Sequence, residues 1–143
     1  MKLITKETDY AVRALANLAK DGALLKNAKL ISIKEKIPYP FLRKILRKFK
    51  EKKYIETKKG INGGIRLIKN PKKINITDVI ELFQGRIELS SCMFRKKLCA
   101  NRKTCVLRKK IIGIEDTVIQ KFKNITIHDL VRGKGGRDEK KDN

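Results

Sequence analysis

Residues 38–67 decide the fold and read PYPFLRKILRKFKEKKYIETKKGINGGIRL. Pro38 and Pro40 force a turn and prepare the first turn of a helix. One side of that helix is basic, and the other carries an apolar stripe of Phe41, Leu42, Ile45, Leu46 and Phe49. After Lys53 the pattern changes to a strand over 54–58, a glycine-containing turn over 60–64 and a returning strand over 65–68. The stretch therefore predicts a helix followed by a β-hairpin.

Two more helices are expected before this stretch. Apolar residues with helical spacing, between Ala11 and Ala19, predict a first helix that Thr5 caps and Asp21-Gly22 ends. A shorter helix is expected over 28–36, with Ile31 and Ile37 facing inward. Three helices and a two-stranded hairpin form a winged helix-turn-helix, so the fold class is mainly α with a small β-hairpin wing (α+β).

The rest of the chain divides by pattern. Thr77 is expected to cap a short helix that Gly85 closes, so the winged helix-turn-helix region covers 1–85. Residues 86–104 show no periodicity and hold the cysteines, whereas 105–132 are expected to form a long helix and a final turn. Residues 133–143 are rich in glycine and charge and are expected to form a disordered tail.

The long helix carries an apolar seam that one small domain would struggle to bury alone. Its members are Leu107, Ile111, Ile114, Val118 and Phe122, with Ile112 and Ile119 beside them. The long helix is therefore expected to need a further surface that covers this seam.

Composition narrows the choice of partner. The 143 residues include 37 Lys plus Arg against 15 Asp plus Glu, a net charge of +22, which favours a polyanion as the partner. The longest apolar runs fall short of the roughly 20 residues that span a bilayer. The first residues turn charged at once, unlike a signal peptide, so we expect a cytoplasmic protein with no membrane partner.

Basic residues gather on the predicted third helix and wing together. Seven lie between positions 43 and 53, and six lie between 58 and 73, where there is no acid. A basic helix alone could simply be a solvated surface, but helix and wing together favour double-stranded DNA. The candidate DNA contacts are Tyr39, Pro40, Arg43, Lys44 and Arg47 on the helix, with Lys58, Lys59, Asn62 and Gly63 on the wing.

Three cysteines form a second candidate site. Cys92, Cys99 and Cys105 are separated by six and five residues, whereas zinc sites usually show tighter pairs. Wide spacing in an irregular loop suits an iron–sulfur cluster. Eight basic residues and no acid between positions 92 and 110 offset the negative charge of such a centre. The alternatives are unrelated free thiols, or a zinc-stabilised basic protein that binds RNA.

Enzymatic function is not expected. The sequence shows no Ser/His/Asp set and no paired-carboxylate motif, and the glycines at 60–64 lack the Lys-Ser/Thr end of a phosphate-binding loop.

Three motifs give a family resemblance: Thr8–Leu15, the wing Lys59–Leu67, and Ile76–Glu81. Together with the cysteines they resemble the Rrf-two (BadM/IscR/NsrR-type) family of bacterial regulators, over about residues 1–132. One departure is Lys36, where the family often has Gly. The resemblance implies a homodimeric transcriptional repressor on palindromic DNA, in which the long helix over 105–123 is the dimerisation helix and crosses its mate. The apolar seam of that helix agrees with this. The resemblance also implies an iron–sulfur cluster held by Cys92, Cys99 and Cys105.

The resemblance also bears on the fourth ligand. IscR-like members carry a His three residues after the last Cys, but here that position is Arg108, which cannot bind iron. NsrR-like members use a first-helix carboxylate from the other subunit, and the matching residue is Asp9. This implies Asp9 on a 4Fe–4S cluster that senses nitric oxide. A 2Fe–2S sensor of cluster supply, iron or redox state is the alternative.

Other residues near these sites have simpler roles. An acid such as Asp9 near a helix start also stabilises the helix by itself. His128, the only histidine, falls in a capping segment, and Glu88 matches no motif. If Asp9 is the ligand, nitric oxide should displace it, let the first helix shift against the dimer helices and release the DNA.

Overall fold

The computed structural model describes residues 2–90 and 99–133. Three helices come first, α1 (Lys6–Lys20), α2 (Ala28–Glu35) and α3 (Tyr39–Glu51), followed by strands β1 (Ile55–Lys58) and β2 (Gly64–Leu67). The short 3-10 helix η1 (Pro71–Lys73) leads to α4 (Ile76–Gln84), α5 (Val106–Lys123) and α6 (Ile127–Gly133). This order confirms the predicted winged helix-turn-helix with a long helix after it.

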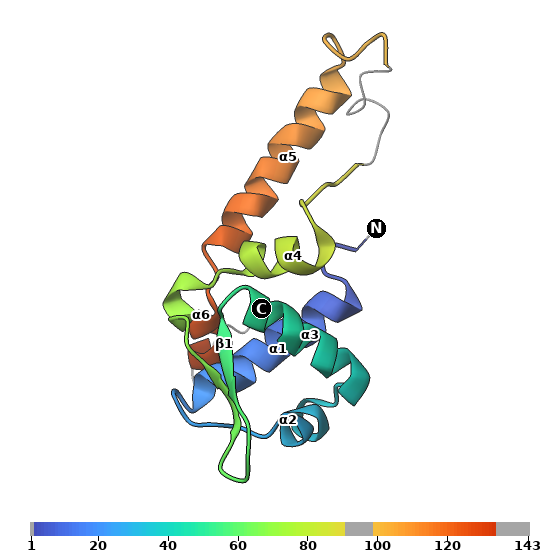
Figure 1. Cartoon of the computed structure of the whole chain (residues 1–143). Helices are drawn as coiled ribbons and strands as arrows, with labels where there is room; N and C mark the ends of the chain where they lie inside the picture. The colour runs from blue at the N-terminus through green and yellow to red at the C-terminus, as the bar shows by residue number, and fades with distance from the viewer. Residues whose placement is uncertain (1, 91–98, 134–143) are drawn as a thin grey trace, which may run out of the picture.

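Helix α1 is the centre of the core. It packs against α2, α3, α4 and α6, and the fully buried side chains around it include Leu15, Leu18, Leu42 and Phe49. The expected inward residues Ile31 and Ile37 of the α2 region are buried as well. Because α6 closes over α1, the chain returns to the core after leaving it along α5 (Figure 1).

The wing is a two-stranded antiparallel sheet in which Ile55 pairs with Leu67 and Lys58 pairs with Gly64. An isolated bridge adds an unpredicted contact, because Lys26 and Ile65 exchange two backbone hydrogen bonds of 2.8 Å. A side chain at Gly64 would come within 2.8 Å of the Lys26 carbonyl oxygen, so glycine permits this approach. The half of β2 nearest the turn of the wing is thereby joined to the loop between α1 and α2.

Helix caps agree with the sequence at most ends. The Thr5 side chain caps α1 as expected, and Gly85 and Asn124 end α4 and α5. The expectation that Thr77 caps α4 is wrong, since Asn75 does so in a reciprocal capping box with Asp78. Thr77 is buried within the helix instead, because its position faces α5 and its hydroxyl donates to the Ile119 carbonyl oxygen at 3.4 Å.

Helix α5 projects from the body, as Figure 1 shows. Val118, Ile119 and Phe122 near its end pack on the core, whereas Leu107 and Ile114 are 60% and 56% exposed. Within the described residues, the expected seam therefore packs on the core near the end of α5, while Leu107 and Ile114 stay exposed. The predicted tail lies outside the described residues from 134 onward, and so does Cys92. None of the described helices is long and apolar enough to cross a membrane.

Candidate functional site

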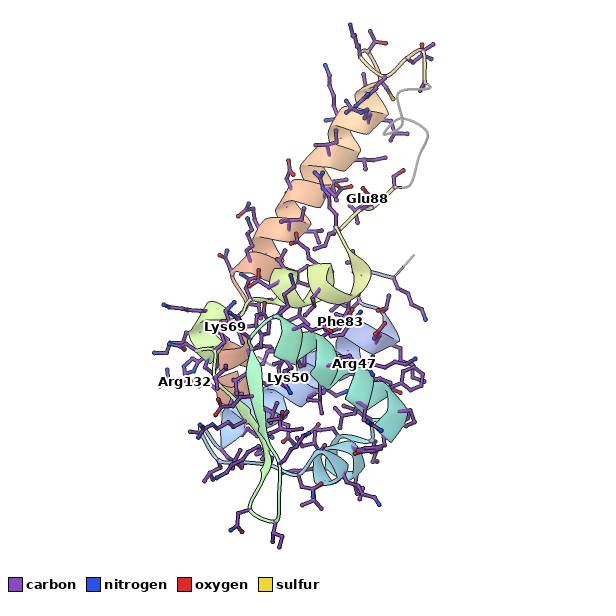
Figure 2. The ribbon with its side chains drawn as sticks, in the orientation of Figure 1. Arg47, Lys50, Lys69, Phe83, Glu88 and Arg132 are labelled. Atoms are coloured by element: carbon purple, nitrogen blue, oxygen red, sulfur yellow. The ribbon has the colours of Figure 1, made fainter. Side chains whose placement is uncertain are left out.

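The basic face of α3 is one part of the candidate site. Its apolar stripe anchors the helix on the core through Leu42, Ile45 and Phe49. The opposite side leaves Arg43, Lys44, Arg47 and Lys50 exposed, and Figure 2 labels Arg47 and Lys50 on this helix. These cations are therefore presented to solvent by the same packing that fixes the helix.

The start of α3 adds aromatic surface to this face. Tyr39 and Pro40 are exposed, as is Phe41, which was expected in the apolar stripe but is half exposed. Phe41 lies edge-on to Tyr10 with ring centroids 6.3 Å apart. The Lys44 ammonium lies 6.0 Å from the centre of the Phe41 ring. The buried stripe therefore begins at Leu42 and not at Phe41, which lies at its exposed edge.

Some basic side chains nearby are already engaged within the chain. Lys48 lies 3.7 Å from a Glu7 oxygen and 4.6 Å from the centre of the Phe83 ring. Lys69, labelled in Figure 2, lies over the ring of buried Tyr54 at 4.4 Å. Burial, with a smaller contribution from Asp78, raises the pKa of the Tyr54 hydroxyl above its usual 10.0.

The wing carries the remaining candidates. Lys58, Lys59 and Asn62 are exposed around its tip. Gly63 is tightly packed, because a side chain there would lie 2.1 Å from the Lys58 carbonyl oxygen. Arg66 and Glu56 form an ion pair across the strands, so Arg66 has an internal partner. The tip therefore offers two lysines, one amide and bare backbone.

Lys26 has a structural role that sequence reasoning missed. Its ammonium lies 2.6 Å from an Asp21 oxygen and 2.9 Å from the Asn17 side-chain oxygen, and it also donates to the Asn17 carbonyl oxygen. The hydrogen bond and charge of Lys26 lower the pKa of Asp21 below its usual 3.8. No spacing signal marks Lys26 among the chain's many lysines.

The outer end of α5 holds the two described cysteines. Cys99 and Cys105 are partly buried and form no disulfide. Cys105 caps α5, and its sulfur accepts from the backbone N–H of Arg108 at 3.4 Å. The side chain of Arg108 is partly buried, and its Nε is buried without a hydrogen-bond partner. Cys92 stays a prediction, because it lies outside the described residues.

Asp9 lies in the first turn of α1, away from the cysteines of the same chain (Figure 1). Its carboxylate is exposed and accepts from Arg13 Nη2 at 2.8 Å and Nε at 3.1 Å. Arg13 Nη1 also donates to the carbonyl oxygen of Glu35, the last residue of α2, at 2.7 Å. Arg13 thus joins the candidate ligand to the helix-turn-helix, a contact that the sequence did not predict.

The described residues bring no three His, Cys, Asp or Glu side chains together as a metal site. His128 lies in α6, where the Thr126–Asp129 cap matches the expected capping segment. Hydrogen bonds from the Thr126 backbone and hydroxyl lower the pKa of Asp129 below 3.8. Glu88 is exposed on the segment that leads toward Cys92 (Figure 2).

Comparison with known proteins gives a family match over nearly the whole described chain. A family model described as "Rrf2: Iron-dependent Transcriptional regulator" matches residues 4–133. The regulator NsrR of Shouchella clausii is 39% identical over 98 residues, which are 65% of this chain and 63% of that protein. A putative helix-turn-helix regulator of Aquifex aeolicus is 36% identical over 91 residues, 64% of this chain and 63% of that protein. The chain thus matches less than two thirds of the length of these relatives.

Solved structures share the fold. CymR of B. subtilis, described as its global cysteine regulator, aligns with a TM-score of 0.76 and 21% identity, covering 93% of this chain and 98% of that one. IscR of T. potens aligns with a TM-score of 0.72 and 16% identity, covering 100% of this chain and 93% of that one. The predicted winged-helix architecture is therefore confirmed.

Proposed function

Because this chain belongs to the Rrf2 family of transcriptional regulators, in its NsrR-like branch, we propose that it represses transcription as a homodimer on palindromic DNA under the control of an iron–sulfur cluster. The observation that carries this proposal is the separation of two sites in one chain. A basic helix and wing occupy the body, whereas thiols stand at the outer end of α5 (Figure 1). Because DNA is the proposed partner, we also propose a cytoplasmic location. The named relatives are transcriptional regulators, which supports a regulatory rather than an enzymatic role.

Exposure of the α3 cations supports the DNA half of the proposal. Arg43, Lys44 and Arg47 project from a helix that the core holds rigidly, as groove reading requires. Lys58, Lys59 and Asn62 lie on the wing, where Gly63 lets the turn close tightly against the Lys58 carbonyl oxygen, and such side chains can bind phosphates. Tyr39 and Pro40 at the helix start add contacts to the sugar-phosphate backbone.

An operator-binding assay tests these assignments. Arg43→Ala should weaken binding to the operator by about 1–3 kcal/mol and weaken random DNA less, because arginine can read a guanine edge. Lys121→Ala removes the same charge from exposed α5 and serves as the control. Equal losses for the two variants on both DNAs would show that Arg43 reads no base.

The residues at the end of α5 fit the proposed cluster. Cys99 and Cys105 are thiols without disulfides, and Arg108 Nε is a buried donor with no protein acceptor. Sulfur atoms of a cluster accept such hydrogen bonds. The centre would be held by Cys92, Cys99 and Cys105, and we propose a 4Fe–4S rather than a 2Fe–2S cluster. Its iron would supply the reactivity toward nitric oxide.

We assign the fourth ligand to Asp9 of the second copy, since α1 and the cysteines lie apart in one protomer (Figure 1). Arg13 donates two hydrogen bonds to Asp9 Oδ2, so Asp9 Oδ1 is the oxygen that would bind iron. The same Arg13 also donates to the Glu35 carbonyl oxygen. A change in the ligation of Asp9 would therefore reach, through Arg13, the turn between α2 and α3 that positions the DNA-reading helix α3.

Anaerobic purification tests the cluster and its ligand. The wild-type protein should be brown and contain iron and acid-labile sulfide, and Mössbauer spectra should show one distinct iron that Asp9→Ala alters. Glu7→Ala removes a carboxylate from the same first turn and should leave the spectrum unchanged. Colourless protein that contains zinc would favour the zinc-stabilised RNA-binding alternative.

A further inference from the structure

Arg108 carries an unexplained buried donor. Its Nε is the one side-chain nitrogen or oxygen atom in the described ranges 2–90 and 99–133 that is buried without a hydrogen-bond partner. Buried donors nearly always have an acceptor in folded proteins. This N–H therefore marks a position where an acceptor belongs.

The surroundings of Arg108 indicate what that acceptor is. The residue lies in the first turn of α5, and its backbone N–H bonds the sulfur of Cys105. Its neighbours Leu107 and Lys109 are exposed, whereas the Arg108 side chain is partly buried. The side chain therefore faces inward on the turn that Cys105 begins.

The same face of α5 contacts the segment that follows α4. Glu115 lies two helical turns beyond Arg108 and is buried, and its Oε2 accepts from the backbone N–H of Leu89 at 3.0 Å. Leu89 begins the approach to Cys92 along the chain. Arg108 thus lies on the side of α5 that contacts Leu89 through Glu115.

We propose that Arg108 is a positioning residue for the cluster, an inference that rests on the proposed function. In this role the Arg108 guanidinium donates a hydrogen bond to a sulfur atom of the cluster. The side chain binds no iron, because arginine does not deprotonate in proteins. Its fixed positive charge offsets the negative charge of the thiolates and favours the reduced centre. Hydrogen bonds and charge at cluster sulfurs are known determinants of reduction potential.

Reduction potential and iron retention test the proposal on the anaerobic full-length protein. Arg108→Gln keeps amide donors but removes the charge. We expect the equilibrium constant for one-electron reduction of its cluster to fall about tenfold. This corresponds to a reduction potential lower by about 59 mV. Iron loss to a fixed concentration of chelator should be several-fold faster. Lys109→Gln removes the same charge from the exposed neighbouring position and should change both quantities much less.

Arg108→Lys separates charge from geometry and guards against misfolding of the glutamine variant, with circular dichroism as the check of fold. It should keep nearly the wild-type potential while losing iron faster, because lysine lacks the Nε–H fork. If Arg108→Gln and Lys109→Gln have the same reduction potential and the same rate of iron loss, the positioning role of Arg108 is overturned and the proposed function is not. A wild-type protein that holds no iron overturns the proposed function and this inference together.

Discussion

Phe49 and Phe41 lie on the same helix but have different surroundings. Phe49 is fully buried, stacked on Tyr54 at 6.0 Å and edge-on to Phe83 at 5.5 Å, whereas Phe41 is half exposed. Phe49→Ala should lower the free energy of unfolding by about 3–5 kcal/mol, because it leaves a cavity where three elements meet. Phe41→Ala should cost much less. Urea denaturation measures both, and equal losses contradict this description of the core.

The Asp21–Lys26 pair makes a prediction about pH. The folded pKa of Asp21 lies below 3.8, so the ionised carboxylate stabilises the fold above that pH. This contribution disappears as the pH falls through the lowered pKa. Lys26→Met should bring the Asp21 pKa back toward 3.8, as carboxyl NMR titration can measure.

Asp129 is the internal control for that titration. Its pKa is lowered by hydrogen bonds from Thr126, not by Lys26, so Lys26→Met should leave it unchanged. If the pKa of Asp21 stays low in the variant, the ammonium is not its cause.

At the scale of elements, the turn of the wing depends on the close packing of Gly63. Any side chain at Gly63 meets the Lys58 carbonyl oxygen at 2.1 Å, so Gly63→Ala must displace the backbone of the turn. We expect a lower unfolding temperature and weaker operator binding. Ile61→Ala, at the fully exposed tip, should leave the unfolding temperature unchanged. A Gly63→Ala protein that melts like wild type would contradict the turn geometry.

The sequence predicted most elements because their signals are local. Apolar spacing marked α1 and α3, and the change of period after Lys53 marked the hairpin. Thr77 was misassigned because Asn75, two residues earlier, is an equally good cap, and only contact with α5 shows that Thr77 is buried. The Lys26–Ile65 bridge joins segments about 40 residues apart, and no local pattern specifies it.

At the scale of the whole molecule, α5 leaves apolar side chains uncovered. Leu107 and Ile114 are more than half exposed, while Val118 and Phe122 on the same seam pack on the body. We expect Ile114→Glu to convert a dimer to a monomer in sedimentation velocity, because the carboxylate would be buried between two helices. Gln120→Glu adds the same charge at an exposed position beside the seam. Unchanged sedimentation of Ile114→Glu would place the dimer contact elsewhere.

A site built from residues far apart in the sequence is the feature that sequence patterns predict least well. The cysteines attract attention by their clustering, but Asp9 is one of many surface acids and pairs with Arg13 in a single chain. Only its motif, Thr8-Asp9-Tyr10, singled it out, through the family resemblance. The link from Asp9 through Arg13 to Glu35 depends on how α1 packs against α2, which spacing does not reveal.

The most direct test of cluster-controlled repression is operator affinity during anaerobic titration with nitric oxide. Fluorescence anisotropy at fixed salt would report DNA binding while absorption reports the cluster, with Cys99→Ser as the control. We predict that wild-type affinity falls at least about tenfold, 1.4 kcal/mol, as the cluster absorption disappears, while Cys99→Ser starts weak and does not respond. Loss of the cluster absorption with unchanged operator affinity would contradict the account.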